Sequence, residues 1–301
     1  MSIRIELLMT VLGVLVWAAG SSPSSYPVRA AEVPISLELD YRSLQPGEII
    51  LLTIRSPRAL AAAHVRMNDE KFPTVPKDSG PGSARMALIG IDLATEPGEY
   101  TVTAAAVLKD GNRGEAHRNI RIAAREFPVK RLRVEQKYVT PPASVLERIR
   151  RESQLMRAIY ASDSPDWLGT GPFRMPVQGK AFPNFGERRI FNGEPRSPHS
   201  GVDISAPGGT PVHAANSGRV VLADDLYYSG NTVVIDHGLG MFTIYCHFSR
   251  TRVRRGDMVD SGDKIGEVGA TGRVTGPHLH WSVRLRGARV DPFALLELGF
   301  E

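Results

Sequence analysis

From Pro172 onward, short apolar runs alternate with glycine-rich turns, and few stretches between the turns are long enough for a helix. The runs include GTPVHAANSGRVVLAD, NTVVIDHG and HLHWSVRLRG. Apolar runs of this length bounded by glycine are typical of strands. The pattern therefore predicts an antiparallel β-domain, closed or sandwiched, over residues 172–301. The 29 glycines and 22 prolines of the chain agree with a fold that is mainly β.

A second series of short strands is predicted over residues 32–127. Strand-like runs here are separated by Gln-Pro-Gly, Glu-Pro-Gly and Lys-Asp-Gly, which are turn signals. This spacing predicts a small β-sandwich, and the segment PGEYTV is similar to the closing strands of immunoglobulin-like modules. The segment contains no cluster of chemically capable residues. We therefore expect this domain to position, bind or cover something rather than to catalyse a reaction.

A linker and an amphipathic helix are predicted between the two domains, over residues 128–171. Pro141-Pro142 ends the linker, and the helix is expected from about Ala143 to Ala161. One face of this helix is apolar, with Val145, Leu146, Ile149, Met156, Ile159 and Tyr160. The opposite face carries Arg148, Arg151 and Glu152. The pattern predicts a helix that packs on the domain that follows it.

The chain is basic, with a net charge of +5 and a pI near 9.4. Residues 125–157 hold nine Lys/Arg and four Asp/Glu, so this stretch alone contributes +5. The charge favours an anionic partner, but no nucleic-acid-reading motif accompanies it, and we expect no nucleic acid partner. A solvated linker and helix face explains the same charge.

The first 31 residues resemble a secretory signal peptide. Arg4 precedes a 14-residue apolar run, residues 7–20, and cleavage is expected after Ala30 or Ala31. We therefore expect export to the periplasm or cell envelope, with no stable membrane span after cleavage. An uncleaved N-terminal anchor is the alternative. The single cysteine, Cys246, forms no internal disulfide and is expected to be a buried thiol.

Histidines are concentrated near the end of the chain. His278 and His280 are separated by one residue, and residues at i and i+2 of a strand project from the same face. His199 and Asp203 lie four apart in HSGVD, where Gly201 lets the backbone fold so that the two side chains converge. His247 lies in YCHF, where alternation places Tyr245 beside it. A catalytic zinc site needs only three protein ligands, so two of the imidazoles would be left for proton transfer and charge stabilisation.

HSGVDISAPGGTPV, GNTVVIDHG, TIYCHF, VRRGDMVDSGDKIGEVGATG and TGPHLHW resemble, in this order, the lysostaphin/LytM family of zinc endopeptidases. The resemblance covers residues 185–293. It implies a LytM-type β-domain and the hydrolysis of peptide bonds in bacterial cell-wall peptidoglycan, in cross-links or bridge peptides. Cys246 and Phe248 stand where the family usually has a small residue and Leu or Met.

The resemblance also implies roles for five residues. His199, Asp203 and His280 would hold one Zn²⁺, and His247 and His278 would be catalytic histidines. A water molecule activated at the metal would attack the scissile carbonyl. One of these two histidines would move the proton to the leaving amine, and the other would stabilise the oxyanion.

Several alternatives stay open in the sequence. One is a catalytically silent LytM-type regulator that activates another wall hydrolase, although such members have typically lost zinc ligands. A swinging-arm carrier would need a lysine at a hairpin tip, a place that Lys264 does not fit. Asn184 or Asn192 could block the zinc, and Arg188 and Arg189 could line the cleft. Structural or surface roles are expected for the remaining histidines, which are His64, His117, His213 and His237.

Overall fold

The structure is a computed structural model that describes residues 33–77, 83–133, 140–162 and 164–300. The predicted signal peptide lies outside the described residues. In the part of the chain that is described, no helix is long and apolar enough to cross a membrane. All the described residues belong to one compact unit.

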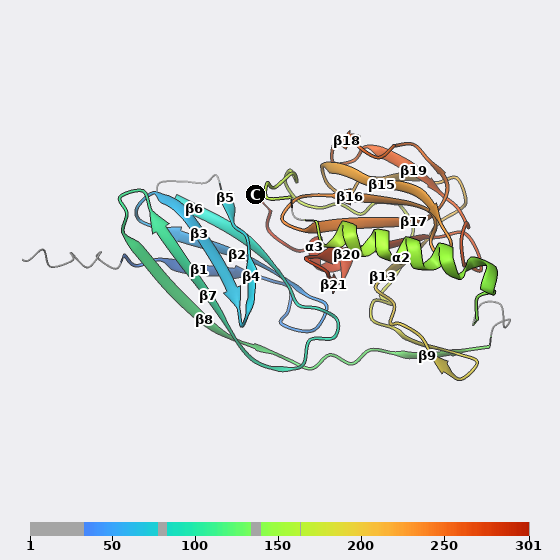
Figure 1. Cartoon of the computed structure of the whole chain (residues 1–301), viewed down its shortest axis with the longest axis horizontal. Helices are drawn as coiled ribbons and strands as arrows, with labels where there is room; N and C mark the ends of the chain where they lie inside the picture. Colours follow the sequence, from blue (N-terminus) through green and yellow to red (C-terminus); the bar gives the residue numbers. More distant parts are fainter. Residues whose placement is uncertain (1–32, 78–82, 134–139, 163, 301) are drawn as a thin grey trace, which may run out of the picture. The chain divides into compact units, whose positions relative to one another are not determined.

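Two antiparallel sheets form a β-sandwich in the N-terminal part of the chain, as predicted (Figure 1). One sheet has the order β1-β2-β6-β5, with the bounds Ser36–Asp40, Ile49–Ser56, Ser83–Gly90 and Val75–Lys77. The other has the order β4-β3-β7-β8, with the bounds Glu70–Phe72, Leu60–Met67, Gly98–Leu108 and Arg113–Ile122. Lettered in chain order, these are the A-B-E-D and C′-C-F-G sheets of an immunoglobulin-like domain. The fold class predicted for this region is confirmed.

Strand β2 of the sandwich is buried on both faces. Ile50, Leu52 and Ile54 pack in the core between the two sheets, whereas Ile49 and Leu51 belong to the buried cluster of the C-terminal region. The unbroken apolar run IILLTI follows from this, because a strand covered on both sides cannot alternate apolar and polar residues.

The predicted Gln-Pro-Gly turn lies directly before β2, and its backbone geometry explains why it contains a glycine. The amide of Glu48 donates to the carbonyl of Gln45 at 3.2 Å, which closes a β-turn around Pro46 and Gly47. Gly47 has a φ of +91°, a value that glycine adopts without steric cost.

The predicted helix consists of a 3₁₀ turn, η1 (Ala143–Val145), followed by α2 (Leu146–Tyr160). Leu155, Met156, Ile159 and Tyr160 pack on a buried cluster from the C-terminal sheet. Two details differ from the sequence pattern, and the first is that Leu146 of the predicted apolar face is exposed. Arg148 and Glu152 do not face away from the domain, because Arg148 pairs with Asp225 and Glu152 accepts the amide of Tyr227 at 2.9 Å.

The segment before α2 contains a strand, β9 (Val129–Leu132). It runs parallel to β11 (Arg188–Phe191), which pairs in turn with β12 (Glu194–Pro195). This part of the linker therefore extends a small sheet next to the C-terminal domain.

The C-terminal domain is built on a large antiparallel sheet with the order β10-β13-β20-β17-β16-β15-β18 (Figure 1). Strands β14, β19 and β21 pair at its sides, and α3 (Pro292–Leu295) follows β21. The strand bounds are β10 Lys180–Phe182, β13 Gly201–Ser205, β14 Pro211–His213, β15 Gly218–Leu226, β16 Gly230–Asp236, β17 Met241–Thr251, β18 Met258–Val259, β19 Lys264–Val268, β20 Leu279–Leu285 and β21 Ala288–Val290.

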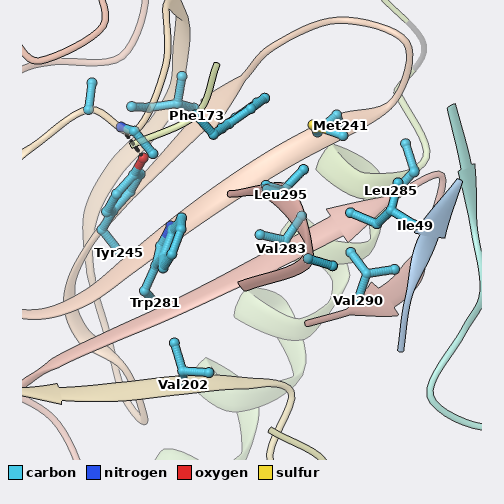
Figure 2. Packing of buried hydrophobic residues seen from close by; sticks show 14 of the residues in the cluster. Ile49, Phe173, Val202, Met241, Tyr245, Trp281, Val283, Leu285, Val290 and Leu295 are labelled. Atoms are coloured by element: carbon cyan, nitrogen blue, oxygen red, sulfur yellow. Dashed lines mark hydrogen bonds between the residues drawn. The ribbon is translucent and has the colours of Figure 1, made fainter. Parts of the chain in front are cut away.

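The core of this domain surrounds Trp281 and Tyr245, both fully buried (Figure 2). The hydroxyl of Tyr245 accepts the amide of Ala215 at 2.9 Å, which satisfies the polar end of a buried ring. Val202, Val283 and Leu285 extend the same cluster along β13 and β20. These two strands also carry site residues, so core packing fixes the backbone from which those residues project.

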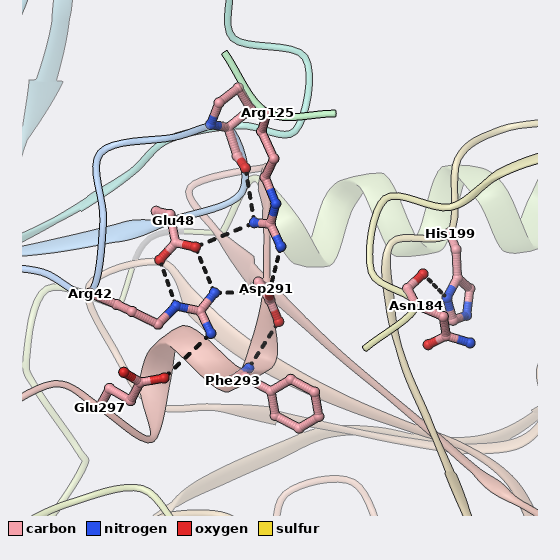
Figure 3. A network of polar contacts seen from close by, with 9 residues as sticks. Arg42, Glu48, Arg125, Asn184, His199, Asp291, Phe293 and Glu297 are labelled. Carbon is pink, nitrogen blue, oxygen red and sulfur yellow. Dashed lines mark hydrogen bonds and ion pairs between the residues drawn. The ribbon is translucent and has the colours of Figure 1, made fainter. Parts of the chain in front are cut away.

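A buried ionic network ties residues of the sandwich to Asp291, the N-cap of α3 (Figure 3). One oxygen of Asp291 accepts from Arg42 at 2.9 Å and from Arg125 at 3.0 Å. Both arginines also pair with Glu48, whose side chain is only 2% exposed. The burial is tolerated because each carboxylate is paired and hydrogen-bonded.

Candidate active site

His199, Asp203 and His280 converge where β13 pairs with β20. His199 lies just before β13, and Asp203 stands directly opposite His280 in the antiparallel register. Directly paired residues have Cβ atoms about 4.5–5.5 Å apart, so the pairing itself brings the carboxylate to the imidazole.

Gly201 is required here for a reason other than the predicted one. It lies within β13 rather than in a turn, and a Cβ at this position would stand 2.4 Å from the carbonyl oxygen of Trp281. The same Cβ would be 2.9 Å from a ring carbon of His280. Glycine thus allows β13 to approach β20 closely at the place where the site residues meet.

The three side chains offer ligand atoms that all lie within 4.8 Å of one another. Oδ1 of Asp203 is 3.2 Å from Nε2 of His199 and 3.0 Å from Nδ1 of His280. These two ring nitrogens are 2.9 Å apart. Burial alone would raise the pKa of Asp203, but its hydrogen bonds to His199 and His280 and their charges outweigh burial and hold the pKa well below its usual range. Asp203 is therefore a carboxylate at any physiological pH.

His199 is oriented by its second ring nitrogen. Its Nδ1–H donates to the carbonyl of Asn184 at 2.9 Å (Figure 3), so Nε2 is the ring nitrogen that faces Asp203 and His280. In metal-binding histidines, a hydrogen bond made by the ring nitrogen that does not face the metal fixes the tautomer and the orientation of the ring. Two imidazole nitrogens and one carboxylate, turned toward a common point, fit the donor set of a catalytic zinc.

His247 reaches the site through a β-bulge. Between Tyr245 and Phe248 the register of β17 against β16 shifts by one residue, and His247 has a φ of +67°. The regular alternation predicted for YCHF is therefore broken, because a bulge of this kind re-aims a side chain. Tyr245 points into the core, and the ring of His247 lies 4.9 Å from the ring of His278.

The two remaining histidines of the site, His247 and His278, share one tautomer. Nδ1–H of His247 donates to the carbonyl of Thr271, and that of His278 donates to the carbonyl of Gly276, both at 2.9 Å. Nε2 of His278 lies 3.7 Å from Oδ1 of Asp203. Burial lowers the pKa of His247 to about 3, helped by the charges of His280 and His278 and opposed by the Thr271 hydrogen bond and Asp203. Both rings can thus present Nε2 to a reactant.

Asn184 contacts the site more closely than the sequence indicates. Its side-chain amide donates to Oδ2 of Asp203 at 2.8 Å, and its Oδ1 accepts the amide N–H of Asp203 at 3.1 Å. Arg189 also lies beside this carboxylate, with Nη2 3.4 Å from Oδ2. Asn192, in contrast, is an exposed residue of the β11–β12 turn. No spacing rule distinguishes Asn184 from Asn192, since the contacts depend on how the β10–β11 loop folds onto β13.

The other histidines lie apart from this cluster. His237 is fully buried, with its ring nitrogens bonded to the carbonyl of Ser217 and the hydroxyl of Thr243, both at 2.7 Å. His213 bonds the carbonyl of Gly262 at 2.8 Å, and the sandwich residues His64 and His117 are exposed. Cys246 is buried as predicted, and its burial raises the pKa of the thiol to about 12.

The family model described as Peptidase family M23 matches residues 197–292, the stretch that contains all five clustered residues. Residues 197–292 of the C-terminal domain thus match this peptidase family. The resemblance expected from the sequence is thereby confirmed.

Named relatives agree with this assignment. The peptidoglycan DD-endopeptidase ShyA of Vibrio cholerae is 44% identical over 135 residues, which cover 44% of this chain and 31% of that protein. The DD-carboxypeptidase/endopeptidase Mpg of Neisseria meningitidis is 42% identical over 97 residues, which cover 32% of this chain and 22% of that protein. The chain therefore spans less than a third of the length of these relatives.

A crystal structure described as a putative peptidase M23 from Pseudomonas aeruginosa is similar over a longer stretch. It has a TM-score of 0.64 and 28% sequence identity, and the match covers 85% of this chain and 96% of that chain. The likeness thus extends beyond the residues that the family model matches.

Proposed function

We propose that this protein is a zinc-dependent endopeptidase that hydrolyses peptide bonds in bacterial cell-wall peptidoglycan. The observation that carries the proposal is the convergence of His199, Asp203 and His280 on one point of an M23 domain, with His247 and His278 beside it. The names of the relatives point to peptidoglycan as the substrate and hence to action outside the cytoplasm, in the periplasm or cell envelope.

His199, Asp203 and His280 would hold the metal in this proposal. A bound zinc would polarise the scissile carbonyl and acidify a water molecule. Two imidazoles and one carboxylate are a ligand set that catalytic zinc sites use, so these three residues would be sufficient to hold the ion. The carbonyl of Asn184 and its side chain would keep His199 and Asp203 in place.

His247 and His278 would handle protons and charge. Each directs its Nδ1–H to a backbone carbonyl, so each can take up a proton at Nε2. One of them would accept the proton of the attacking water at Nε2 and deliver it to the leaving amine. The other, carrying at Nε2 a proton taken from solvent, would donate a hydrogen bond to the oxyanion and keep that proton when the C–N bond breaks. The ring separation of 4.9 Å lets both address one tetrahedral centre.

The proposal can be tested with purified mature protein and isolated peptidoglycan. Mass spectrometry of the released muropeptides should reveal new amine termini, which should vanish with a chelator and return with zinc. His280→Ala, assayed in parallel, should release none. If the wild-type protein holds zinc and yet produces no new amine termini, the regulator is the correct alternative.

A further inference from the structure

The position of His247 beside His278 depends on an unusual stretch of backbone. His247 lies in the bulge of β17, and its φ of +67° falls in the left-handed region, which residues other than glycine rarely adopt. A backbone conformation of this kind persists only where the surrounding structure holds it in place. The contacts that hold the bulge therefore also determine where the ring of His247 lies.

Thr271, in the β19–β20 loop, contacts the bulge with both its backbone and its side chain. Its carbonyl accepts the ring N–H of His247 at 2.9 Å. Its hydroxyl donates to the carbonyl of Phe248, the next residue of β17, also at 2.9 Å. A single residue thus bonds the ring of His247 and the backbone that directly follows it.

The hydroxyl of Thr271 is also bonded to the start of β16. It accepts the backbone N–H of Asn231 at 2.9 Å, and the side-chain amide of Asn231 donates to the same carbonyl of Phe248 at 3.0 Å. The chain approaches this hydroxyl so closely that a Cβ on Gly230 would stand 2.3 Å from Oγ1 of Thr271. The β19–β20 loop, β16 and β17 are therefore joined at one oxygen atom.

The hydroxyl is the part of Thr271 that a substitution can remove. Every residue offers a backbone carbonyl, but only serine shares with threonine a hydroxyl this close to the backbone, able to donate and to accept at once. Without it, the backbone N–H of Asn231 would lose its partner, and the carbonyl of Phe248 would keep only the Asn231 side chain. The loop would then no longer be fixed to the bulge, and the carbonyl that bonds His247 would move with the loop.

The other proposed catalytic histidine does not depend on such a contact between segments. The ring of His278 bonds the carbonyl of Gly276, two residues earlier in the same loop. The ring of His247 bonds a residue 24 positions away. A displaced β19–β20 loop should therefore change the tautomer and orientation of His247 before those of His278.

We propose that Thr271 is a positioning residue of the active site. Its hydroxyl holds the β19–β20 loop against the bulge of β17, so that its carbonyl keeps His247 in the tautomer with the proton on Nδ1 and leaves Nε2 for the reaction. The inference rests on the proposed peptidase function and deepens it, since it names the group that keeps His247 ready to act.

The test compares two variants of Thr271 in the zinc-loaded protein, with cross-linked muropeptides as substrate. Thr271→Val keeps the size of the side chain but removes the hydroxyl, and it should lower kcat about 10- to 100-fold with KM changed less than about twofold. Thr271→Ser keeps the hydroxyl and should stay within about threefold of the wild-type kcat.

Two further variants complete the comparison. Thr210→Val is the matched control, because it removes a hydroxyl that donates to the carbonyl of Pro207 in a turn of the same domain, and it should leave kcat and KM unchanged. Asn231→Ala removes only the side-chain bond to Phe248 and should lower kcat about threefold. If Thr271→Val does not fold, an unchanged kcat in Asn231→Ala would overturn the inference.

The ring nitrogens of His247 give a readout that does not depend on catalysis. Heteronuclear NMR of the zinc-loaded protein, with the His247→Ala variant to assign the signals, reports which ring nitrogen carries the proton. We expect one tautomer of His247, protonated at Nδ1, in the wild-type protein and in Thr271→Ser. A mixture of the two tautomers is expected in Thr271→Val, with the signals of His278 unchanged.

The outcomes separate the positioning role from a structural one and from the peptidase proposal. A wild-type kcat in Thr271→Val, or an unchanged tautomer of His247 in that variant, would overturn the inference. An equal loss of kcat in Thr271→Ser and Thr271→Val, or a loss of zinc in Thr271→Val, would also overturn it, because the role would then be structural. If even the wild-type protein cleaves no muropeptide but the tautomer of His247 changes in Thr271→Val alone, the positioning role stands and the peptidase proposal fails.

Discussion

The sandwich and the C-terminal domain are both antiparallel β-structures with buried aliphatic cores, yet they differ in where their histidines lie. The sandwich histidines, His64 and His117, are exposed on strands β3 and β8. In the C-terminal domain, His199, His247 and His280 gather within a few ångströms of Asp203 or of one another.

Local irregularities account for the difference between the two domains. In the C-terminal domain, a glycine lets two strands approach, a bulge re-aims His247, and a loop folds Asn184 onto Asp203. Secondary structure alone therefore does not create a site. Deviations from ideal strand geometry, supported by a packed core, bring the chemically capable groups together.

The sharpest way to test this contrast is to remove one histidine from each domain. We expect His247→Ala to fold and to keep zinc but to lose about 10²–10³ in kcat, because one group that stabilises the transition state is lost. His64→Ala, in the sandwich, should match the wild-type protein. Muropeptide release measures the activity of each variant, and zinc content shows whether the variant still binds the metal. More than about a tenth of the activity left in His247→Ala would contradict the role proposed for it.

The buried ionic network tests whether the sandwich stabilises the fold. Asp291→Asn should lower the free energy of unfolding by about 3 kcal/mol, because Arg42 and Arg125 then lose a buried charged partner. Glu297→Gln is the matched control, since this glutamate is 55% exposed and pairs with Arg42 at 3.5 Å. Its effect should stay below about 1 kcal/mol. Denaturant unfolding measures both, and equal stabilities would refute the importance of the network.

A smaller effect is expected from the loop that supports Asp203. Asn184→Ala removes two hydrogen bonds to Asp203 but keeps the backbone carbonyl that orients His199. Zinc affinity should fall about 10- to 100-fold, as is usual when a partner of a metal ligand is lost. Competition with a chromophoric chelator gives the affinity. Asn192→Gly, which tolerates the local φ of +50°, should change it little. A rise in affinity or activity in Asn184→Ala would instead indicate that Asn184 restrains the site.

The smallest effect concerns a histidine that lies outside the site. Burial lowers the pKa of His237 to about 4, against the hydrogen bond to Ser217 and the charge of Asp236. The unfolded chain binds a proton at His237 more readily than the folded chain does. The neutral imidazole therefore contributes to the free energy of unfolding above about pH 6.5, and this contribution is lost as the pH falls toward 4. Between pH 7 and pH 5.5 the free energy of unfolding should drop by about 1 kcal/mol more in the wild-type protein than in His237→Gln. Parallel pH profiles would show that His237 is not the titrating group.

Much of this protein could be predicted from local sequence patterns. Turn signals and short apolar runs indicated both β-domains, and the spacing of Pro142 and the apolar stripe located α2 within about three residues. The HLH pair also predicted that His278 and His280 share a face, and both lie within 4 Å of Asp203. These features depend on side-chain periodicity and backbone preferences, which are properties of neighbouring residues.

Only the tertiary structure decided the rest. The bulge at His247, the contact of Asn184 with Asp203, the strand β9 and the hydrogen bond from His247 to Thr271 all join segments far apart in the chain. Such contacts depend on strand register and loop packing, where a shift of one residue turns a side chain to the other face. The sequence thus contained the five chemical groups, and long-range pairing set their distances and tautomers.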